Sequence, residues 1–290
     1  MSTLSIEPLA GALGALVHGV DLSRPLDEAT FAAIRDALLN YGVIFFRDQS
    51  LEPAHQLAFA KRFGAIHLHP HVGGLPDMPE IMEILKTETD THNFGAGWHT
   101  DQMFLPEPAM ATCLYALEVP ETGGDTLFAC LRAAYESLSD GMQALARGLR
   151  TLNLSVAGQL TQSGATSAAT FSGMRTREAD GSETPAVHPL VRAHPETGED
   201  VLYMGLHTLG FEGFRPEESQ PLIAYLMAQI SRPEHTCRFR WQPGSLALWD
   251  NRRVVHNAIN DYPGKRRRMH RVTIAGDVPV FQDKAADAIA

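Results

Sequence analysis

His99 and Asp101 are the two side chains of this sequence best suited to hold a metal ion together. They lie two positions apart in the stretch Trp-His-Thr-Asp at residues 98–101. In an extended segment such residues point to the same side, so an imidazole and a carboxylate would converge on one point. His256, which follows Trp-Asp-Asn at residues 249–251, is the candidate third ligand. Two histidines and one carboxylate form the facial triad that holds non-heme Fe(II) and leaves coordination positions open.

A histidine followed two residues later by an acidic residue is weak evidence by itself. About one or two such pairs should occur by chance in a chain of this composition. The sequence has two, His99 with Asp101 and His194 with Glu196. The second pair flanks Pro195 in a turn typical of a hairpin, where we expect both side chains to be solvated. The first pair follows a tryptophan and precedes an apolar run, which favours His99 and Asp101 as the ligands.

Three further histidines, His67, His69 and His71, stand at alternate positions and would share one face of an extended segment. Pro70 between them and the two glycines at 73–74 favour a loop instead. Histidines in such a loop are usually exposed, so the sequence does not favour a second metal site here.

The composition limits the partners of this protein. The chain has 290 residues, of which 44% are apolar and 20% charged, and its formal net charge is −10. A substantial core is therefore expected, and neither nucleic acid nor an anionic membrane is favoured as a partner. The sequence has neither a long apolar run nor a signal-peptide pattern at its start, which predicts a cytoplasmic protein. Cys113, Cys130 and Cys237 lack paired spacing and are expected to be reduced core residues.

Short apolar runs separated by Gly/Pro turns organise the rest of the chain. Apolar spacings of three and four predict helices at 25–41, 53–63, 131–149 and 216–230. Strands are expected at 43–46, 110–119, 125–129, 187–192, 201–204, 236–241, 245–249, 254–258 and 267–275. These elements predict a mainly β fold of the α+β kind with a jelly-roll, or double-stranded β-helix, core. No internal repeat or linker is found, so residues 1–290 are expected to form one domain.

Residues 155–183 are rich in Ser, Thr, Gly and Ala and show weak periodicity. Such a stretch is typical of a long mobile loop, and in enzymes loops of this kind often close over the active site. The alternative is a disordered insertion. We expect an active-site loop.

One basic cluster stands out in this acidic chain. It is Lys-Arg-Arg-Arg at 265–268, followed by Arg271. On a strand, Arg267 and Arg271 would share one face, while Arg268 and His270 would point the other way. The cluster is therefore predicted to belong partly to a site and partly to the surface.

Four stretches of the sequence together resemble the TauD/TfdA family of Fe(II)- and 2-oxoglutarate-dependent dioxygenases. They are residues 98–101, Gly-Gly-Asp-Thr at 123–126, residues 249–251 ahead of His256, and RRMHRVTIAG at 267–276. The resemblance implies a double-stranded β-helix core that uses Fe(II), 2-oxoglutarate and O2. It also implies that His99, Asp101 and His256 bind the iron, and that Thr126 and Arg267 bind the far carboxylate of 2-oxoglutarate.

The residues suit the chemistry that the resemblance implies. Three protein ligands on one face of an iron ion leave room for a chelating 2-oxo acid and for dioxygen. An arginine such as Arg267 fits the far carboxylate because its planar fork pairs with both oxygens. Oxidative decarboxylation of 2-oxoglutarate yields succinate and carbon dioxide while the substrate is oxidised. Related halogenases have a small residue where this chain has Asp101, so the aspartate implies hydroxylation.

The resemblance also points to the residues that would bind the substrate. Arg271 and His69 match the arginine and histidine that grip the sulfonate in taurine-using members. Val72 and Gly95, however, stand where those members have a tyrosine and an asparagine that contact taurine. We therefore expect a small organic acid other than taurine.

Two more residues are candidates for contacts with the substrate. His207 lies in a Gly-Leu-His setting similar to that of the aryloxyalkanoate-oxidising members, and Gln102 follows the ligand Asp101. The anionic head of the substrate could belong to a sulfonate, an alkyl sulfate or an aryloxyalkanoate.

A protein of another class remains as the alternative. A cupin-like jelly roll could bind a small ligand or a structural metal without catalysis. Such a protein would not need both Arg267 and Thr126 beside an open-sided triad. The sequence leaves open whether the protein forms a homo-oligomer.

Overall fold

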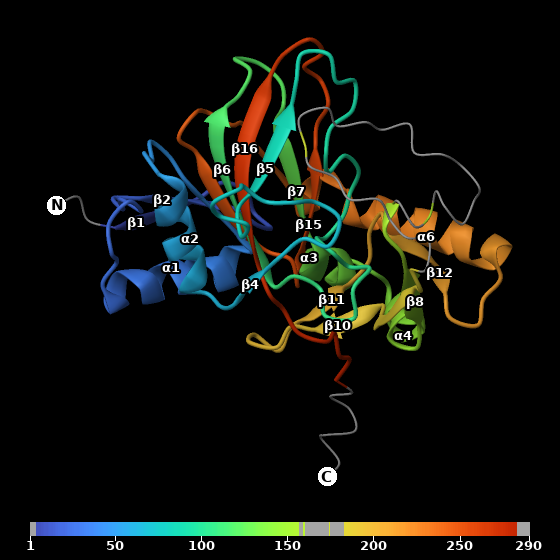
Figure 1. Ribbon diagram of the computed structural model, residues 1–290. Helices are drawn as coiled ribbons and strands as arrows, with labels where there is room; N and C mark the ends of the chain where they lie inside the picture. Colours follow the sequence, from blue (N-terminus) through green and yellow to red (C-terminus); the bar gives the residue numbers. More distant parts are fainter. Residues whose placement is uncertain (1–3, 157–158, 160–173, 175–182, 283–290) are drawn as a thin grey trace.

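The computed structural model describes residues 4–156, 159, 174 and 183–282. Most of residues 155–183, the expected active-site loop, lie outside this described part of the chain. The strands form the centre of the molecule, with helices α1 (Glu28–Tyr41) and α2 (Pro53–Lys61) on one side and α6 (Pro216–Ile230) on the other (Figure 1).

A large sheet forms one half of the core. In spatial order it contains β1 (Ser5–Pro8), β2 (Ala15–His18), β3 (Val43–Phe46), β14 (Leu246–Asp250), β6 (Ala111–Glu118), β16 (Arg267–Ile274) and β4 (Ile66–His67), and β5 (Met82–Lys86) also pairs with β16. Neighbouring strands run antiparallel except β2 and β3, which are parallel. The predicted strand at 43–46 is confirmed, and all four of its side chains are buried because both faces of the sheet are covered.

A smaller sheet faces the large one across an apolar layer. Its order is β13 (Thr236–Phe239), β7 (Thr126–Cys130) and β15 (Val254–Ala258). Phe45 of the large sheet stacks on Phe239 at 3.9 Å between ring centroids and meets Phe128 at 5.5 Å. Two facing, mainly antiparallel sheets with such a shared core make up the predicted double-stranded β-helix.

Helices α1 and α2 cover the outer face of the large sheet. Helix α1 begins after Asp27, whose side chain accepts a hydrogen bond from the backbone N of Thr30 at 2.7 Å. It ends at Gly42, whose φ of 72° lies in the left-handed region that glycine adopts at low cost. Both helices pack apolar side chains against the sheet, including Ile34, Leu38, Leu57 and Phe59.

The predicted helix at 131–149 is wrong, because the segment forms two helices. They are α3 (Leu131–Glu136) and α4 (Asp140–Arg147). The first helix ends at Glu136, and Ser139 caps the second by accepting a hydrogen bond from the backbone N of Met142 at 3.4 Å. Apolar spacing continues across the break, which is why periodicity alone predicted one helix.

Short strands complete the structure around α6. The order β12 (Thr208–Phe211), β8 (Arg150–Asn153), β9 (Ala186–Pro189) forms a third sheet, and β10 (Val191–Ala193) pairs with β11 (Asp200–Leu202). The expected strand at 187–192 is therefore divided between two sheets. Helix α6 is confirmed with its predicted bounds and is followed by the 3-10 helix η1 (Pro233–His235).

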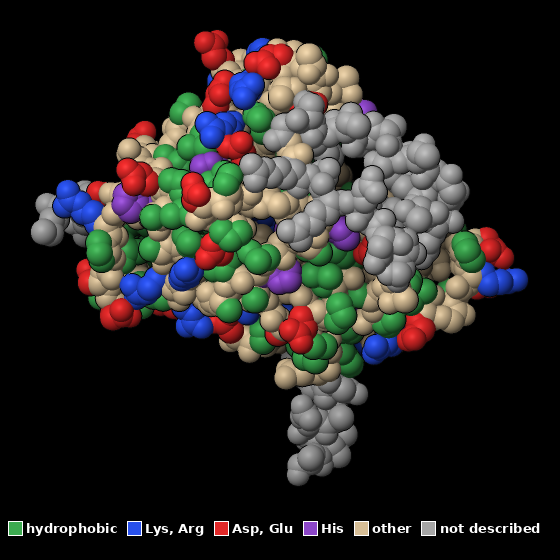
Figure 2. All heavy atoms as spheres, viewed as in Figure 1, with side chains coloured by type: hydrophobic (Ala, Val, Ile, Leu, Met, Phe, Trp, Pro, Cys, Tyr) green, Lys and Arg blue, Asp and Glu red, His purple; other side chains and the backbone are tan. Residues whose placement is uncertain are grey.

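The surface and the cysteines are consistent with the composition. On the face in Figure 2, basic side chains lie among acidic ones. All three cysteines are buried and unpaired, as predicted. Among the described residues, no helix is both long and apolar enough to cross a membrane.

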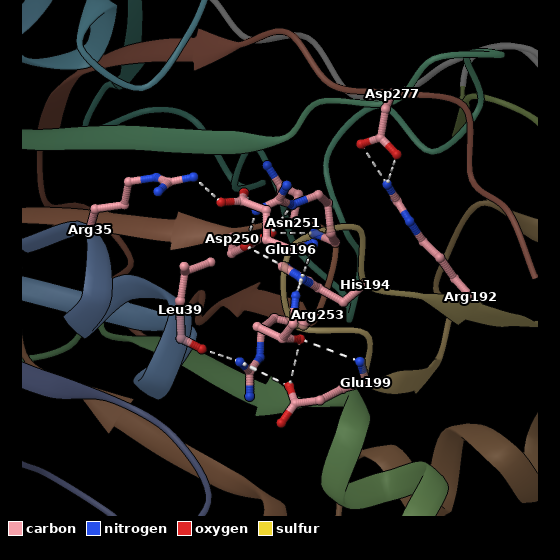
Figure 3. Close-up of polar contacts among 12 residues, drawn as sticks. Arg35, Leu39, Arg192, His194, Glu196, Glu199, Asp250, Asn251, Arg253 and Asp277 are labelled. Carbon is pink, nitrogen blue, oxygen red and sulfur yellow. Dashed lines mark hydrogen bonds and ion pairs between the residues drawn. The ribbon is translucent and has the colours of Figure 1, made fainter. Parts of the chain in front are cut away.

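Buried charged side chains hold the turn between β14 and β15 (Figure 3). Asp250 accepts hydrogen bonds from the guanidinium of Arg252 at 2.8 and 2.7 Å, and its Oδ2 lies 3.0 Å from Nε2 of His194. Arg252 also donates to Glu196 at 2.8 Å, and Glu196 pairs with Arg35 of α1. The turn is thereby tied both to α1 and to the loop between β10 and β11.

The expectation that both His194 and Glu196 are solvated is wrong for His194. The side chain of His194 has no exposed surface, whereas Glu196 is an exposed residue whose side chain also pairs with Arg252. Asp250, more than fifty residues away in sequence, supplies the partner that makes the burial of His194 possible. A hairpin turn in the sequence gives no sign of such distant partners.

We predict that the buried ion pair of Asp250 and Arg252 makes the protein sensitive to acid. Burial alone would raise the pKa of Asp250, but the charge and hydrogen bonds of Arg252 outweigh it and hold the pKa well below its usual range. A lowered carboxyl pKa stabilises the fold above the unfolded value of about 4, and this stability is lost as the pH falls below it. Urea unfolding from pH 6 to 3 should show the loss.

An Asp250→Asn variant should show a smaller change in unfolding free energy between pH 6 and pH 3 than the unaltered protein. Asp140→Asn, in the exposed first turn of α4, is the control and should leave the pH dependence unchanged. Equal pH dependence in the Asp250→Asn variant and the unaltered protein would contradict the prediction.

Candidate active site

An antiparallel backbone bridge pairs His99 with His256. The N–H of His99 donates to the carbonyl oxygen of His256 at 3.0 Å, and the N–H of His256 donates back at 2.8 Å. Residues paired in this way point their side chains to the same side of the ladder. The two ring centroids accordingly lie 4.1 Å apart.

Asp101 completes a cluster with the two histidines. Its Oδ1 lies 3.7 Å from Nε2 of His99 and 3.8 Å from Nε2 of His256. One potential ligand atom from each residue falls within 4.8 Å of the others, and all three side chains are buried. Within the described ranges no other three His, Cys, Asp or Glu residues meet this condition, so His67, His69 and His71 do not form a second cluster.

The electrostatics of the cluster fit a divalent cation. Burial lowers the pKa of both His99 and His256, which keeps the imidazoles neutral near pH 7. Burial would raise the pKa of Asp101, but Arg271, the two histidines and the hydrogen bond from Thr112 together outweigh it, so the pKa is lowered and the carboxylate stays ionised. Neutral imidazoles and an ionised carboxylate are the forms that bind metal.

Hydrogen bonding and packing orient the two rings. Nδ1 of His99 lies 2.8 Å from the carbonyl oxygen of Gly97, which can only accept, so this nitrogen carries the proton. Nε2 of His99 therefore presents its lone pair toward Asp101. The ring of His256 is held by packing, with the rings of Trp249 and Phe128 at 4.6 and 6.1 Å.

A cavity adjoins the cluster, and both Arg267 and Thr126 line it. The guanidinium of Arg267 is buried, and its Nε and Nη2 have no hydrogen-bond partner among the described residues. It stands 5.7 Å from the ring of Trp241. Nε1 of Trp241 donates to the hydroxyl oxygen of Thr126 at 2.9 Å, so the hydroxyl proton of Thr126 is free to donate elsewhere. A cation and a hydroxyl donor suit a carboxylate ligand.

The cavity combines these polar groups with apolar walls. Its lining consists of Ile84, Phe94, Gly95, His99, Leu114, Thr126, Trp249, His256, Ala258, Arg267 and Arg271. Four apolar members, Ile84, Phe94, Leu114 and Ala258, were missed in the sequence. The strands that carry Leu114 and Ala258 were predicted, but the sequence does not tell which side chains of distant segments face one cavity.

Arg271 contacts the cluster directly, whereas His69 lies outside the cavity lining. Nη2 of Arg271 lies 2.8 Å from Oδ1 of Asp101, within ion-pair distance. His69 is not among the cavity-lining residues, although its ring lies 6.2 Å from that of Phe94. Burial and the charge of Arg271 lower the pKa of His69 to about 3. Nδ1 of His69 accepts from the backbone N of His71, so this neutral ring offers an Nε2–H donor.

His207 and Gln102 are both buried beside the cluster. Nδ1 of His207 bonds to the carbonyl oxygen of Leu154 at 3.2 Å, and its ring lies 6.1 Å from that of His99. Burial and the nearby His99 lower the pKa of His207 to about 4. Gln102 has a positive φ of 56°, and its amide has no hydrogen-bond partner among the described residues.

The fold and the cluster together define a class of protein. A double-stranded β-helix with two histidines and a carboxylate beside a buried arginine has the arrangement of a 2-oxoglutarate-dependent non-heme iron oxygenase. The model of the family described as "Taurine catabolism dioxygenase TauD, TfdA family" matches residues 5–273. The chain belongs to the TauD/TfdA family.

Characterised relatives are similar over nearly the whole chain. An alpha-ketoglutarate-dependent sulfate ester dioxygenase of Pseudomonas putida is 36% identical over 282 residues, covering 97% of this chain and 92% of the relative. An alkylsulfatase of Acinetobacter baylyi is 34% identical, covering 95% and 86%. The crystal structure of a taurine dioxygenase from Burkholderia xenovorans superposes with a TM-score of 0.82 at 36% identity, covering 97% and 94%.

These similarities confirm the predicted family, fold and enzyme class. The protein is a dioxygenase that depends on Fe(II), 2-oxoglutarate and O2, and its substrate is a small organic molecule. They support the dioxygenase interpretation over a non-catalytic cupin-like binding protein.

Proposed function

We propose that this protein hydroxylates the carbon next to the anionic head of a small, largely apolar organic acid, and that alkyl sulfates are its main substrates. One observation carries the proposal. The cavity beside the His-Asp-His cluster joins two buried arginines, Arg267 and Arg271, to apolar walls. Two separate cationic groups suit two anions, the co-substrate and the substrate.

In this proposal, His99 and His256 would hold Fe(II) through Nε2 and Asp101 would hold it through Oδ1. The bound iron with 2-oxoglutarate supplies the oxidising chemistry that replaces a C–H bond of the substrate by C–OH. The residues keep their binding forms because burial disfavours protonated imidazoles. The buried cluster also excludes bulk water from the reacting centre.

Arg267 and Thr126 would hold the far carboxylate of 2-oxoglutarate. The guanidinium supplies charge and a fork of donors, and the Thr126 hydroxyl adds one donor because its oxygen already accepts from Trp241. Together they would fix the direction in which the co-substrate enters the cavity.

The substrate would place its anionic head near Arg271. His69 would add a neutral N–H donor rather than a second charge, because its lowered pKa of about 3 keeps the ring unprotonated. Ile84, Phe94 and Leu114 would pack against the apolar tail. His207 and Gln102 are the remaining candidates for substrate contacts.

The alkyl sulfate assignment rests on two supports. The similarity to a sulfate ester dioxygenase and to an alkylsulfatase favours it. The apolar Val72 and Gly95 also stand where taurine-using members have polar side chains. Hydroxylation of R–CH2–OSO3⁻ gives an unstable R–CH(OH)–OSO3⁻, which would collapse to the aldehyde R–CHO, sulfate and a proton.

We further infer that residues 1–290 form one catalytic domain in the cytoplasm and act on a diffusing small molecule. The net charge of −10 supports a small-molecule substrate, since it disfavours nucleic acid and anionic membranes as partners.

Two measurements test the proposed function. Anaerobic Fe(II) plus 2-oxoglutarate should give a visible metal-to-ligand charge-transfer band with the folded protein. Succinate release should then be compared across hexyl sulfate, hexanesulfonate, taurine and phenoxypropionate. We expect hexyl sulfate to give the highest rate, with one sulfate released per succinate. A folded protein without the band would refute the enzyme assignment, and faster turnover of another member of the panel would refute the substrate assignment.

A further inference from the structure

One oxygen of Asp101 is already engaged by a neighbouring strand. The hydroxyl of Thr112, in β6, donates to Oδ2 of Asp101 at 2.6 Å. Thr112 has no exposed surface, so water does not compete for this bond. The other oxygen, Oδ1, lies near Nε2 of His99 and of His256 and 2.8 Å from Nη2 of Arg271.

Asn251 fixes the direction of this hydrogen bond. Its Oδ1 faces Nε1 of Trp249 at 2.9 Å and the backbone N of Asp101 at 3.2 Å. Both of these nitrogens can only donate, so the atom that faces them must be the amide oxygen. The amide nitrogen Nδ2 is therefore the atom that faces the hydroxyl oxygen of Thr112, at 3.1 Å.

The hydroxyl of Thr112 consequently has one available orientation. Its oxygen accepts from Asn251, so its single proton points to Oδ2 of Asp101. Asn251 is fully buried, and its backbone N donates to the carbonyl oxygen of Met110 at 2.8 Å. It follows Asp250, whose bonds to Arg252 and His194 anchor the turn (Figure 3). The hydrogen bonds from Asn251 to Thr112 and from Thr112 to Asp101 therefore begin at a turn that is buried and held by several further hydrogen bonds.

We propose that Thr112 and Asn251 are positioning residues that hold Asp101 as a metal ligand through Oδ1 alone. The inference rests on the proposed function, because it takes Asp101 as a ligand. A carboxylate free to turn could bind a cation through both oxygens and occupy a second coordination position. By holding Oδ2, the Thr112 hydroxyl reserves that position for the co-substrate or for O2, and it aims Oδ1 at the two imidazoles.

Replacing Thr112 by valine tests the inference, since valine keeps the shape and removes the hydroxyl. Partners of this kind typically contribute about 10- to 100-fold to metal affinity. We expect Thr112→Val to weaken Mn(II) binding by about that factor in calorimetric titration, and to shift the visible band of the anaerobic Fe(II)–2-oxoglutarate complex. Thr112→Ser, which keeps the donor, should retain most of the affinity and the band.

Thr151→Val is the matched control. Thr151 is also fully buried, and its hydroxyl accepts from Asn153 at 2.9 Å and donates to the carbonyl oxygen of His188 at 3.3 Å. The control loses comparable buried hydrogen bonds on β8, away from Asp101, and should keep the Mn(II) affinity. Thr112→Ala replaces Thr112→Val in the titration if the valine variant does not fold.

Asn251→Leu tests the second member of the chain. If Asn251 acts through the Thr112 hydroxyl, Asn251→Leu should weaken Mn(II) binding in the unaltered protein and have a smaller effect in the Thr112→Val background. Fully additive effects would exclude Asn251 from the chain. Unchanged Mn(II) affinity and an unchanged band in the Thr112 variants would overturn the inference. Failure of the unaltered protein to bind Mn(II) would instead refute the proposed function.

Discussion

His99→Ala is expected to remove metal binding and activity together. The ring supplies one of three ligand atoms, and alanine leaves only Asp101 and His256 at the cluster. Groups that merely support a metal ligand contribute about 10- to 100-fold, so we expect loss of a ligand to cost at least about 10³-fold in succinate release. The visible band of the anaerobic Fe(II)–2-oxoglutarate complex should be absent in the variant.

His235→Ala is the matched control for this variant. His235 is 7% exposed against 6% for His99, and each ring places Nδ1 2.8 Å from a backbone carbonyl oxygen. The two substitutions therefore remove the same kind of buried contact, but His235 lies in η1, outside the cluster. A His99→Ala protein that keeps the band and half of the activity would show that the iron binds elsewhere.

The sequence predicts the parts of this fold that depend on local patterns. Helix α6 and strands β3 and β15 have the predicted bounds because their apolar spacing and their end signals agree. Strands β8 and β12 were missed, since four residues such as Arg-Thr-Leu-Asn show no alternation of apolar and polar side chains. Their pairing with each other depends on residues more than fifty positions apart.

The candidate site, too, could be predicted from the sequence only where it depends on local spacing. The shared orientation of His99 and Asp101 follows from their spacing, whereas the choice of His256 among thirteen histidines came from the family resemblance. The hydrogen-bonded bridge between His99 and His256 is a pairing of distant segments, which spacing does not encode. Thr112 was missed for the same reason, because only the sheet register brings β6 beside Asp101.

Arg267 carries the least compensated charge of the site. It lies on β16 with its guanidinium buried, and Nε and Nη2 lack hydrogen-bond partners among the described residues. Burial lowers the pKa of Arg267, which indicates that the charge is costly in this position. An anionic co-substrate would relieve that cost, so binding and stability should be coupled at this residue.

We therefore expect Arg267→Met to weaken 2-oxoglutarate binding severely without destabilising the free protein. Two charge-assisted hydrogen bonds of about 1.5–3 kcal/mol each correspond to a loss of about 10²- to 10⁴-fold in affinity. The thermal midpoint of the variant without co-substrate should equal or exceed that of the unaltered protein, because an unpaired buried cation has been removed. Calorimetric titration of the Fe(II)-loaded protein under anaerobic conditions measures the affinity, and a melting curve measures the stability.

Arg268→Met separates this effect from a general loss of positive charge. Arg268 is the next residue on β16, but its side chain is 45% exposed and donates to Glu83 at 2.6 Å. The control should keep its affinity for 2-oxoglutarate. At 100 times its Kd, the co-substrate should stabilise the control by about 2.7 kcal/mol and the Arg267→Met variant by almost nothing. If Arg267→Met binds 2-oxoglutarate as tightly as Arg268→Met does, the buried guanidinium serves another ligand, and the far carboxylate must be held by other residues.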